Sequence, residues 1–311
     1  MFKCKSILFL SAFSMACATS TFHASAMVVE EEVTTDRTHV SKNHRPRGDK
    51  AAQALILHCV GLPDDWVLKN YVLPTDEGGL GVSAHYYVPG DGRIFQLVDE
   101  SRSAFHAGVS EWRGLAAKNG LKGLNDISVG IEFQTLGYAQ LPKEGYYPYH
   151  FTPFTEEQIN PGILLSQQIM ERHGIAPENV VWHSDVTPRK TDPGPLFPVE
   201  AFAKAGVGVW PSSDRFEDAL LDTSISAVQA QLRDWGYPIV TPTGVWDEAT
   251  KFALQAHYMH YLPTVVKWGD HEEKTTGSVF DAIPEWSEFP YDKDTLSISL
   301  TNLIKGNYRY E

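Results

Sequence analysis

Two histidines and one aspartate occupy positions from which they could together hold a catalytic metal ion. His58 ends the apolar run 54–57, and His183 ends the run 179–182. Asp192 opens the sequence Asp-Pro-Gly-Pro, a proline-stiffened loop that would hold a carboxylate in place. Two imidazoles and one carboxylate form a catalytic zinc set, which leaves one coordination position open for water and can polarise a carbonyl group. Spacing alone is weak evidence here, because the histidines lie far apart and no compact motif joins them.

Two further residues could assist a hydrolytic reaction. Glu132 lies inside the apolar run 129–133, where a carboxylate is costly to bury unless something uses it. It could act as a general base on water, and a structural salt bridge is an equal alternative. Lys190 lies two residues before Asp192 and could place a cation near a developing oxyanion. Taken alone, a lysine in such a loop is more often an ordinary surface residue.

Composition narrows the classes of partner. The chain has 311 residues, with 39 acidic against 26 basic side chains and a formal net charge of −13. Proteins that bind phosphate backbones need a basic surface, so no nucleic acid is expected as a partner. A polymer of neutral sugars and short peptides makes no such demand. The length suits one good core and a small second module, and we expect two domains in a monomer.

Residues 1–26 have the organisation of a signal peptide. Lys3 and Lys5 precede an apolar run over 7–18, and Ala24-Ser25-Ala26 supplies a cleavage site. The run is shorter than the roughly 20 residues that a membrane-spanning helix needs, so no membrane span is expected. We therefore expect an exported protein of the periplasm or cell envelope, with lipid anchoring at Cys17 as an open alternative.

Cys59 is the cysteine that would remain in an exported chain, so no disulfide framework is expected. It follows His58 directly, and successive side chains of a strand point to opposite faces. We expect Cys59 to face away from the metal and to serve as a small buried hydrophobic residue.

Hydrophobic patterning predicts the α/β fold class, with a central mixed β-sheet flanked by helices over residues 49–210. A helix is expected over 163–173, with Gly174 as its C-cap and an upstream capping box formed by Thr155 and Gln158. Residues 27–48 are polar and charged without an apolar period, which is typical of a solvated linker. Short β-prone runs bounded by turn signals are the strand candidates, namely 54–58, 84–88, 94–97, 128–133 and 179–183.

The spacing of apolar residues becomes helical towards the C-terminus and predicts a small all-helical domain over 214–264. His257 and His260 lie at helical spacing within it, but two ligands without a third make a poor metal site, and we place them on the surface. The tail 265–311 contains one weak helical run over 296–304 and stays unassigned.

The motifs around these candidate residues resemble those of the type-2 N-acetylmuramoyl-L-alanine amidases, particularly the AmiD-like branch. The resemblance covers about 51–198 and implies a zinc hydrolase that cuts the amide bond between N-acetylmuramic acid and L-alanine in peptidoglycan. It implies one Zn²⁺ held by His58, His183 and Asp192, with Glu132 as the acid/base residue and Lys190 as the transition-state lysine. The segments that carry it are 57–59, 83–86, 105–108, 125–132, 183–185 and 190–195.

Two other histidines lie inside these motifs. His85 and His106 could line the substrate groove, or support a metal ligand by fixing its tautomer, and packing against the sheet is as compatible with their positions. Aromatic residues could likewise stack on sugar rings or simply cover a core, namely Trp112, Tyr146, Tyr147 and Tyr149.

The helical domain resembles the peptidoglycan-binding domain that often follows such amidases, through segments 228–229, 236–237, 244–246 and 254–255. Such a domain would raise the effective substrate concentration. Two other functions stay open at this point: a non-catalytic peptidoglycan-binding protein, and a zinc peptidase that cuts within the stem peptide. The sequence also leaves open whether intact or 1,6-anhydro muramoyl substrates are preferred.

Overall fold

The computed structural model describes residues 32–135, 153–214, 222, 224–238, 241–265 and 293–310. The predicted signal peptide, most of the tail, and the tyrosines at 146, 147 and 149 lie outside these residues. No helix of the described part is long and apolar enough to span a membrane.

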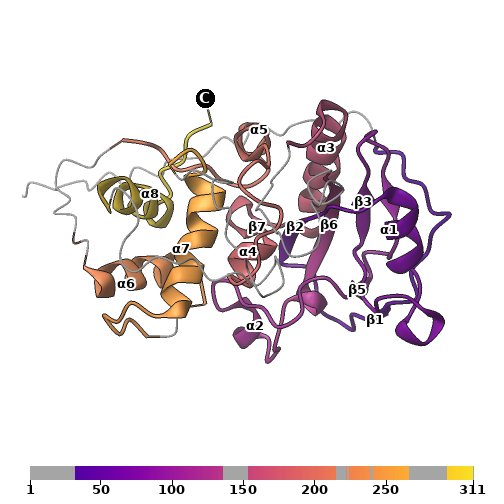
Figure 1. Cartoon of the computed structure of the whole chain (residues 1–311), viewed down its shortest axis with the longest axis horizontal. Coiled ribbons are helices and arrows are strands. Elements are labelled where there is room, and N and C mark those ends of the chain that lie inside the picture. Colours follow the sequence, from indigo (N-terminus) through magenta and orange to yellow (C-terminus); the bar gives the residue numbers. More distant parts are fainter. Residues whose placement is uncertain are drawn as a thin grey trace, which may run out of the picture.

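A five-stranded mixed sheet forms the centre of the molecule, in the strand order β4-β3-β6-β2-β7. β2, β3, β6 and β7 pair in parallel, whereas β3 and β4 pair antiparallel, which confirms the predicted mixed sheet. Figure 1 shows this sheet between α3 and the loops that carry α2, with α1 at one end and α6 to α8 at the other. Among the described residues, the strands are β1 His44–Pro46, β2 Ala54–Val60, β3 Tyr86–Val88, β4 Phe95–Gln96, β5 Arg102–Ala104, β6 Ser128–Gln134 and β7 Val180–Trp182.

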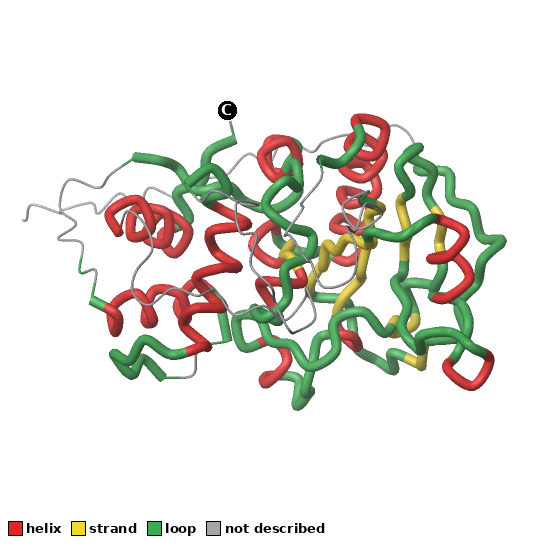
Figure 2. Tube along the Cα trace, viewed as in Figure 1, coloured by secondary structure: helices red, strands yellow, loops and turns green. Residues whose placement is uncertain are grey.

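Helices lie against the sheet and also beyond its β7 end, as the colouring of Figure 2 shows. The described part of the chain also contains short 3₁₀ turns, namely η1 Thr75–Glu77, η2 Asn125–Ile127 and η3 Pro177–Asn179. The α-helices are α1 Asp64–Asn70, α2 Leu115–Lys118, α3 Glu156–His173, α4 His183–Val186, α5 Val199–Lys204, α6 Ile225–Trp235, α7 Glu248–Tyr261 and α8 Lys293–Lys305.

The two faces of the central strands have different roles. Leu55 of β2 and Ile131 of β6 pack with Leu165 and other apolar residues of α3 in a buried cluster. Because strand side chains alternate, residues at even positions of β2 and β6 face the other side. The register pairs His58 of β2 with Glu132 of β6. Two predicted site residues are therefore neighbours at the carboxyl ends of parallel strands.

Helix α3 begins earlier than the sequence predicts. Thr155 and Gln158 form the expected capping box, but they cap this same helix, which runs on to the expected C-cap at Gly174 with φ 64°. The Asn-Pro-Gly sequence at 160–162 disfavours a helix locally, yet the helix continues through it. A Cβ atom on Gly162 would lie 2.5 Å from Cε1 of Phe133, so the glycine is needed for close packing of α3 on the sheet.

The described part of the predicted linker, residues 32–48, is packed into the domain. β1 pairs with β5, and the Arg47 side chain is only 5% exposed. Its guanidinium donates to the backbone carbonyls of Glu100, Asp126, Arg102 and Ser128. The linker prediction is wrong for this stretch. Its polar side chains are not simply solvated, because they also donate hydrogen bonds to buried carbonyl groups of the domain.

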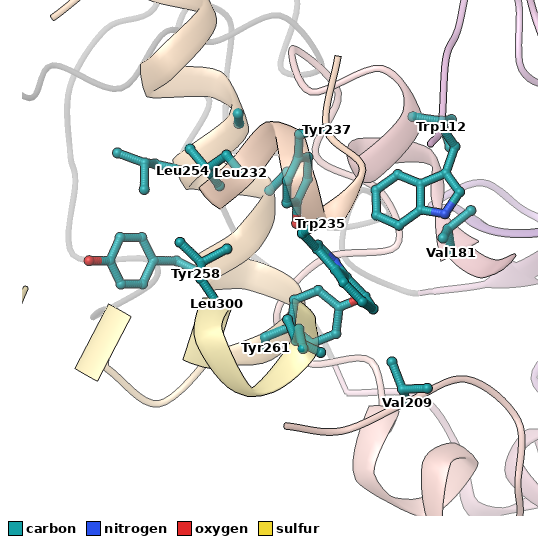
Figure 3. Close-up of a cluster of buried hydrophobic side chains, with 14 of the residues drawn as sticks. Trp112, Val181, Val209, Leu232, Trp235, Tyr237, Leu254, Tyr258, Tyr261 and Leu300 are labelled. Atoms are coloured by element: carbon teal, nitrogen blue, oxygen red, sulfur yellow. The ribbon is translucent and has the colours of Figure 1, made fainter. Parts of the chain in front are cut away.

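The C-terminal helices share one hydrophobic core with the sheet domain. Trp112 and Val181 belong to the same buried cluster as Leu232, Tyr258 and Leu300, which come from α6, α7 and α8 (Figure 3). Helix α8 includes the weak helical run that the sequence indicates in the tail. The boundaries 49–210 and 214–264 stay predictions, but the helices on either side of them do not pack independently.

Candidate metal centre

The three predicted metal ligands meet at one point. The ligand atoms of His58, His183 and Asp192 all lie within 4.8 Å of one another. Oδ2 of Asp192 is 3.2 Å from Nδ1 of His58 and 3.0 Å from Nδ1 of His183. β2 positions His58 near its end, His183 is the first residue of α4, and Asp192 lies in the loop after α4. A hydrogen bond from the backbone N–H of Ser184 to the backbone carbonyl of Asp192 holds this loop against α4.

The charges of this cluster suit a divalent cation. Burial lowers the pKa of His58 to about 4, which keeps its imidazole neutral at physiological pH. Burial opposes ionisation of Asp192, but its interactions with the imidazoles of His183 and His58 hold the pKa of this carboxyl below its usual range. A neutral His58 imidazole and an ionised Asp192 carboxylate are in the donor forms that zinc requires. The donor set therefore fits the cofactor predicted from the sequence.

Glu132 lies beside this cluster with one oxygen atom unused. The residue is 7% exposed, and Oε2 is buried without a hydrogen-bond partner in the described structure. Burial, together with the negative charge of Asp192, raises the pKa of Glu132 to about 8. An unpartnered buried carboxylate oxygen is costly, and such atoms are characteristic of sites that await a ligand or a proton.

Tyr71 contacts the other oxygen of this carboxylate. Tyr71 directly follows helix α1, and its hydroxyl group donates to Oε1 of Glu132 at 3.3 Å. The contact leaves Oε2 as the atom free to receive a proton. The sequence analysis missed Tyr71, and no local pattern distinguishes it, because the contact joins segments that are distant in the sequence.

Lys190 lies in the loop between α4 and Asp192 and is partly exposed. Its backbone N–H donates to the carbonyl of Thr187 at 2.8 Å, which turns the chain back towards the cluster. The positive charge of Lys190 lowers the pKa of His58, which places this charge in the neighbourhood of the ligands.

The structure separates the two additional motif histidines. His106 contacts a ligand directly, since its Nδ1 is 3.0 Å from Nε2 of His58. His85 is fully buried, and its Nδ1 accepts from the backbone N–H of Gly130 at 3.0 Å. Its Nε2 is 3.1 Å from the carbonyl oxygen of Arg102. The structure does not place His85 at a substrate groove, because protein groups already occupy both ring nitrogens.

Other sequence-based placements also change. His257 and His260 are 0% and 2% exposed, so their assignment to the surface is wrong. Trp112 is fully buried and packs edge-on against Trp235, which makes it a core residue. Cys59 is a free thiol of intermediate exposure, less buried than expected.

Comparisons with known proteins point to one enzyme family. A family profile described as N-acetylmuramoyl-L-alanine amidase matches residues 48–195. N-acetylmuramoyl-L-alanine amidase AmiD of Escherichia coli is 36% identical over 223 residues, which cover 66% of this chain and 74% of AmiD. The 1,6-anhydro-N-acetylmuramyl-L-alanine amidase AmpD of Enterobacter cloacae is 29% identical over 189 residues, or 55% of this chain and 90% of AmpD.

Solved structures give the same result in three dimensions. AmiD from E. coli, in complex with the substrate anhydro-N-acetylmuramic acid-L-Ala-D-γ-Glu-L-Lys, is similar with a TM-score of 0.59 and 29% identity. That similarity covers 84% of this chain and 90% of AmiD. AmpDh3 from Pseudomonas aeruginosa, in complex with anhydromuramic pentapeptide, has a TM-score of 0.58 and 26% identity, covering 89% of this chain and all of AmpDh3.

Proposed function

Because this chain belongs to the N-acetylmuramoyl-L-alanine amidase family, we propose that it hydrolyses the amide bond between N-acetylmuramic acid and L-alanine of peptidoglycan at the cluster of His58, His183 and Asp192. The observation that carries the proposal is the convergence of these ligand atoms beside a buried carboxylate with an unpartnered oxygen. The resemblance to AmiD and AmpDh3, both solved with anhydromuramoyl peptides, supports this class of substrate.

His58, His183 and Asp192 would hold one Zn²⁺. When bound, zinc supplies Lewis acidity, which lowers the pKa of a coordinated water and polarises the scissile carbonyl. His58 and Asp192 are almost fully buried, whereas His183 is partly exposed. Substrate would therefore approach past His183, and the protein excludes solvent from the opposite side.

Glu132 would move the proton. In the zinc-bound site the Glu132 carboxyl would be ionised, and its Oε2 would accept a proton from the attacking water while Tyr71 holds Oε1. The water oxygen bonds to the lactyl carbonyl carbon, and the C–N bond breaks as Glu132 returns the proton to the departing nitrogen of L-alanine. The products are a muramoyl carboxylate and a peptide with a free amino terminus. Lys190 would stabilise the negative charge on the carbonyl oxygen during this step.

Mass spectrometry of fragments released from purified peptidoglycan tests the proposal. The expected product is a free stem peptide that begins with L-alanine. Glu132→Gln should lose this activity by a factor of about 100 or more while it still binds zinc. Glu77→Gln, at an exposed carboxylate paired with Lys42, is the matched control and should keep wild-type activity. Full activity of Glu132→Gln would overturn the role assigned to Glu132.

The same experiment separates the alternative functions. A zinc peptidase would release fragments cut inside the stem peptide, with alanine still attached to the sugar. A non-catalytic wall-binding protein would bind peptidoglycan and create no new amino termini. The substrate-bound relatives support the amidase reaction over both.

The C-terminal helices are proposed to bind the wall polymer. Their position behind the amidase domain and the sequence motifs at 228–229, 236–237 and 244–246 support this role. Export by the signal peptide at 1–26 belongs to the same proposal, since peptidoglycan lies outside the cytoplasm, and lipid anchoring at Cys17 is the alternative to cleavage after residue 26. A pull-down with purified sacculi would test the binding role by comparing the wild type with Val245→Asp, a change at an exposed residue of the 244–246 motif that leaves the shared core intact.

A further inference from the structure

We propose that His106 and Ser128 are positioning residues that keep the proton of His58 on Nε2 and leave Nδ1 free to bind the metal. This inference rests on the proposed metal centre and adds a device that controls one of its ligands. A neutral imidazole carries its single proton on either nitrogen, and only the nitrogen without a proton can bind a metal. His58 directs Nδ1 towards Asp192, so the metal requires the proton on the other nitrogen.

A chain of hydrogen bonds leads away from the back of His58. Nε2 of His58 is 3.0 Å from Nδ1 of His106, and Nε2 of His106 is 3.2 Å from Oγ of Ser128. The Ser128 hydroxyl group is in turn 2.8 Å from the backbone carbonyl oxygen of Leu124. The four groups are consecutive partners, and His58, His106 and Ser128 are buried.

The carbonyl at the end sets the direction of every bond in this chain. A carbonyl oxygen can only accept, so the Ser128 hydroxyl group donates to Leu124 and uses its lone pair towards His106. His106 therefore donates from Nε2 and accepts at Nδ1. The remaining bond must come from the N–H of His58 Nε2. The opposite direction would put a proton on Nδ1 of His58, facing Asp192, where it would block the metal.

Strand β6 is built to seat this chain. Ser128, Gly130 and Glu132 alternate along the strand and share one face. The His106 ring lies over Gly130, where an added Cβ atom would be 2.5 Å from Nδ1 of His106. Asn125 fixes the neighbouring backbone, because its Oδ1 accepts from the N–H groups of His106 and Ala107 at 3.2 and 2.7 Å. One face of β6 thus carries the proposed base, the ring seat and the hydroxyl group.

Three variants isolate the hydrogen bond from the packing. His106→Leu keeps an apolar volume but removes the acceptor for His58. His106→Asn places an amide oxygen near the position of Nδ1 and keeps an acceptor. Ser128→Ala removes the next partner and leaves His106 in place. Far-UV circular dichroism establishes that each variant is folded, and Ser128→Ala tests the chain independently if His106→Leu does not fold.

Zinc affinity and the tautomer of His58 are the two readouts. We expect His106→Leu to raise the zinc Kd by about 10- to 100-fold, as loss of a partner behind a ligand does in other metal sites, and His106→Asn to stay within about threefold. Ser128→Ala should also raise the zinc Kd, but by a smaller factor than His106→Leu. In zinc-free protein, Asp192 and His106 compete for the His58 proton. Long-range ¹⁵N–¹H NMR should therefore find a larger share of this proton on Nε2 in the wild type than in His106→Leu.

The outcomes separate this inference from the metal centre itself. Equal zinc affinity for His106→Leu and His106→Asn, or an unchanged His58 tautomer in His106→Leu, would overturn the positioning role. His58→Ala is the reference for the centre: if it binds zinc as tightly as the wild type, the ligand assignment fails and not only its support. Loss of affinity in His106→Leu, with recovery in His106→Asn, supports the inference.

Discussion

The carboxylate of Asp185 and the imidazole of His260 form a buried pair that joins the two halves of the molecule, with 2.7 Å between Oδ2 and Nδ1. The same carboxylate accepts from the backbone N–H of Trp182 at 2.8 Å and from the hydroxyl group of Tyr237 at 3.0 Å. The His260 ring also stacks on Trp182, with 4.1 Å between ring centroids. Trp182 directly precedes the ligand His183, so helix α7 braces the start of α4.

Asp185→Ala should lower the free energy of unfolding by about 3–5 kcal/mol, because it leaves an imidazole and a backbone N–H buried without their partner. Asp234→Ala is the control, since it breaks the exposed pair with Arg233 and should cost less than about 1 kcal/mol. Urea denaturation measures both. Equal, small changes would show that the buried pair contributes no more than an exposed one.

Glu132 should make the zinc-free protein less stable as the pH rises. Its pKa is about 8 in the folded chain, against an ordinary value of 4.5. Between these values the folded state holds a proton that the unfolded state has lost, so this group's contribution falls by about 1.4 kcal/mol per pH unit at most. The contribution is complete below pH 4.5 and lost as the pH rises through 8.

Urea denaturation of zinc-free protein between pH 5 and pH 8.5 measures this loss. We expect the difference in unfolding free energy between wild type and Glu132→Gln to change across the range in favour of Glu132→Gln, which cannot ionise. A difference that stays constant with pH would contradict the raised pKa.

Gly130→Ala should weaken zinc binding although Gly130 is not a metal ligand. The new methyl group would collide with the His106 ring and push it away from His58. We expect a zinc Kd raised by about tenfold or more, measured by competition with a chelator. Gly90→Ala is the control, because its Cβ atom would meet the flexible end of Gln134 at 3.2 Å and Cγ2 of Thr155 at an ordinary contact distance of 3.7 Å. Similar affinities for the two variants would contradict the ring seat.

Leu232→Ala should destabilise the whole molecule by about 2–5 kcal/mol, because Leu232 is fully buried in the core common to the sheet domain and the helices. Tryptophan fluorescence, circular dichroism and zinc release should then follow one unfolding transition. Leu80→Ala, at a leucine that is 49% exposed, should have little effect. Two separate transitions would show that the halves fold independently.

The metal centre is the part that the sequence predicts best. His58 and His183 follow strand-forming runs, and parallel strands bring their carboxyl ends together at one edge of a sheet. Glu132 is conspicuous because it is a carboxylate within an apolar strand. The resemblance to a family indicates that these residues form one site. The spacing of the residues alone does not indicate this.

Long-range contacts of polar residues explain what the sequence could not predict. His260 is polar, and polarity alone predicts a surface position, but its partner Asp185 on a distant helix makes burial possible. Arg47 is buried for the same reason although it lies in a polar stretch, since the carbonyl groups that it binds include those of Arg102 in β5 and Ser128 in β6. Polarity indicates exposure only when no buried partner is present, and a single sequence does not reveal such partners.

The core that α6, α7 and α8 share with the sheet domain makes the connection between the two halves a fixed joint and not a hinge. A flexible linker lets a bound enzyme sample every bond within its radius, whereas a stiff one permits only the bonds that geometry brings to the catalytic centre. If the helices hold a glycan strand, the fixed distance between them and the metal centre would determine which amide bond along the strand is cut. The positions of its cuts would be spaced by the dimensions of the protein, and not by chance encounters around an anchor.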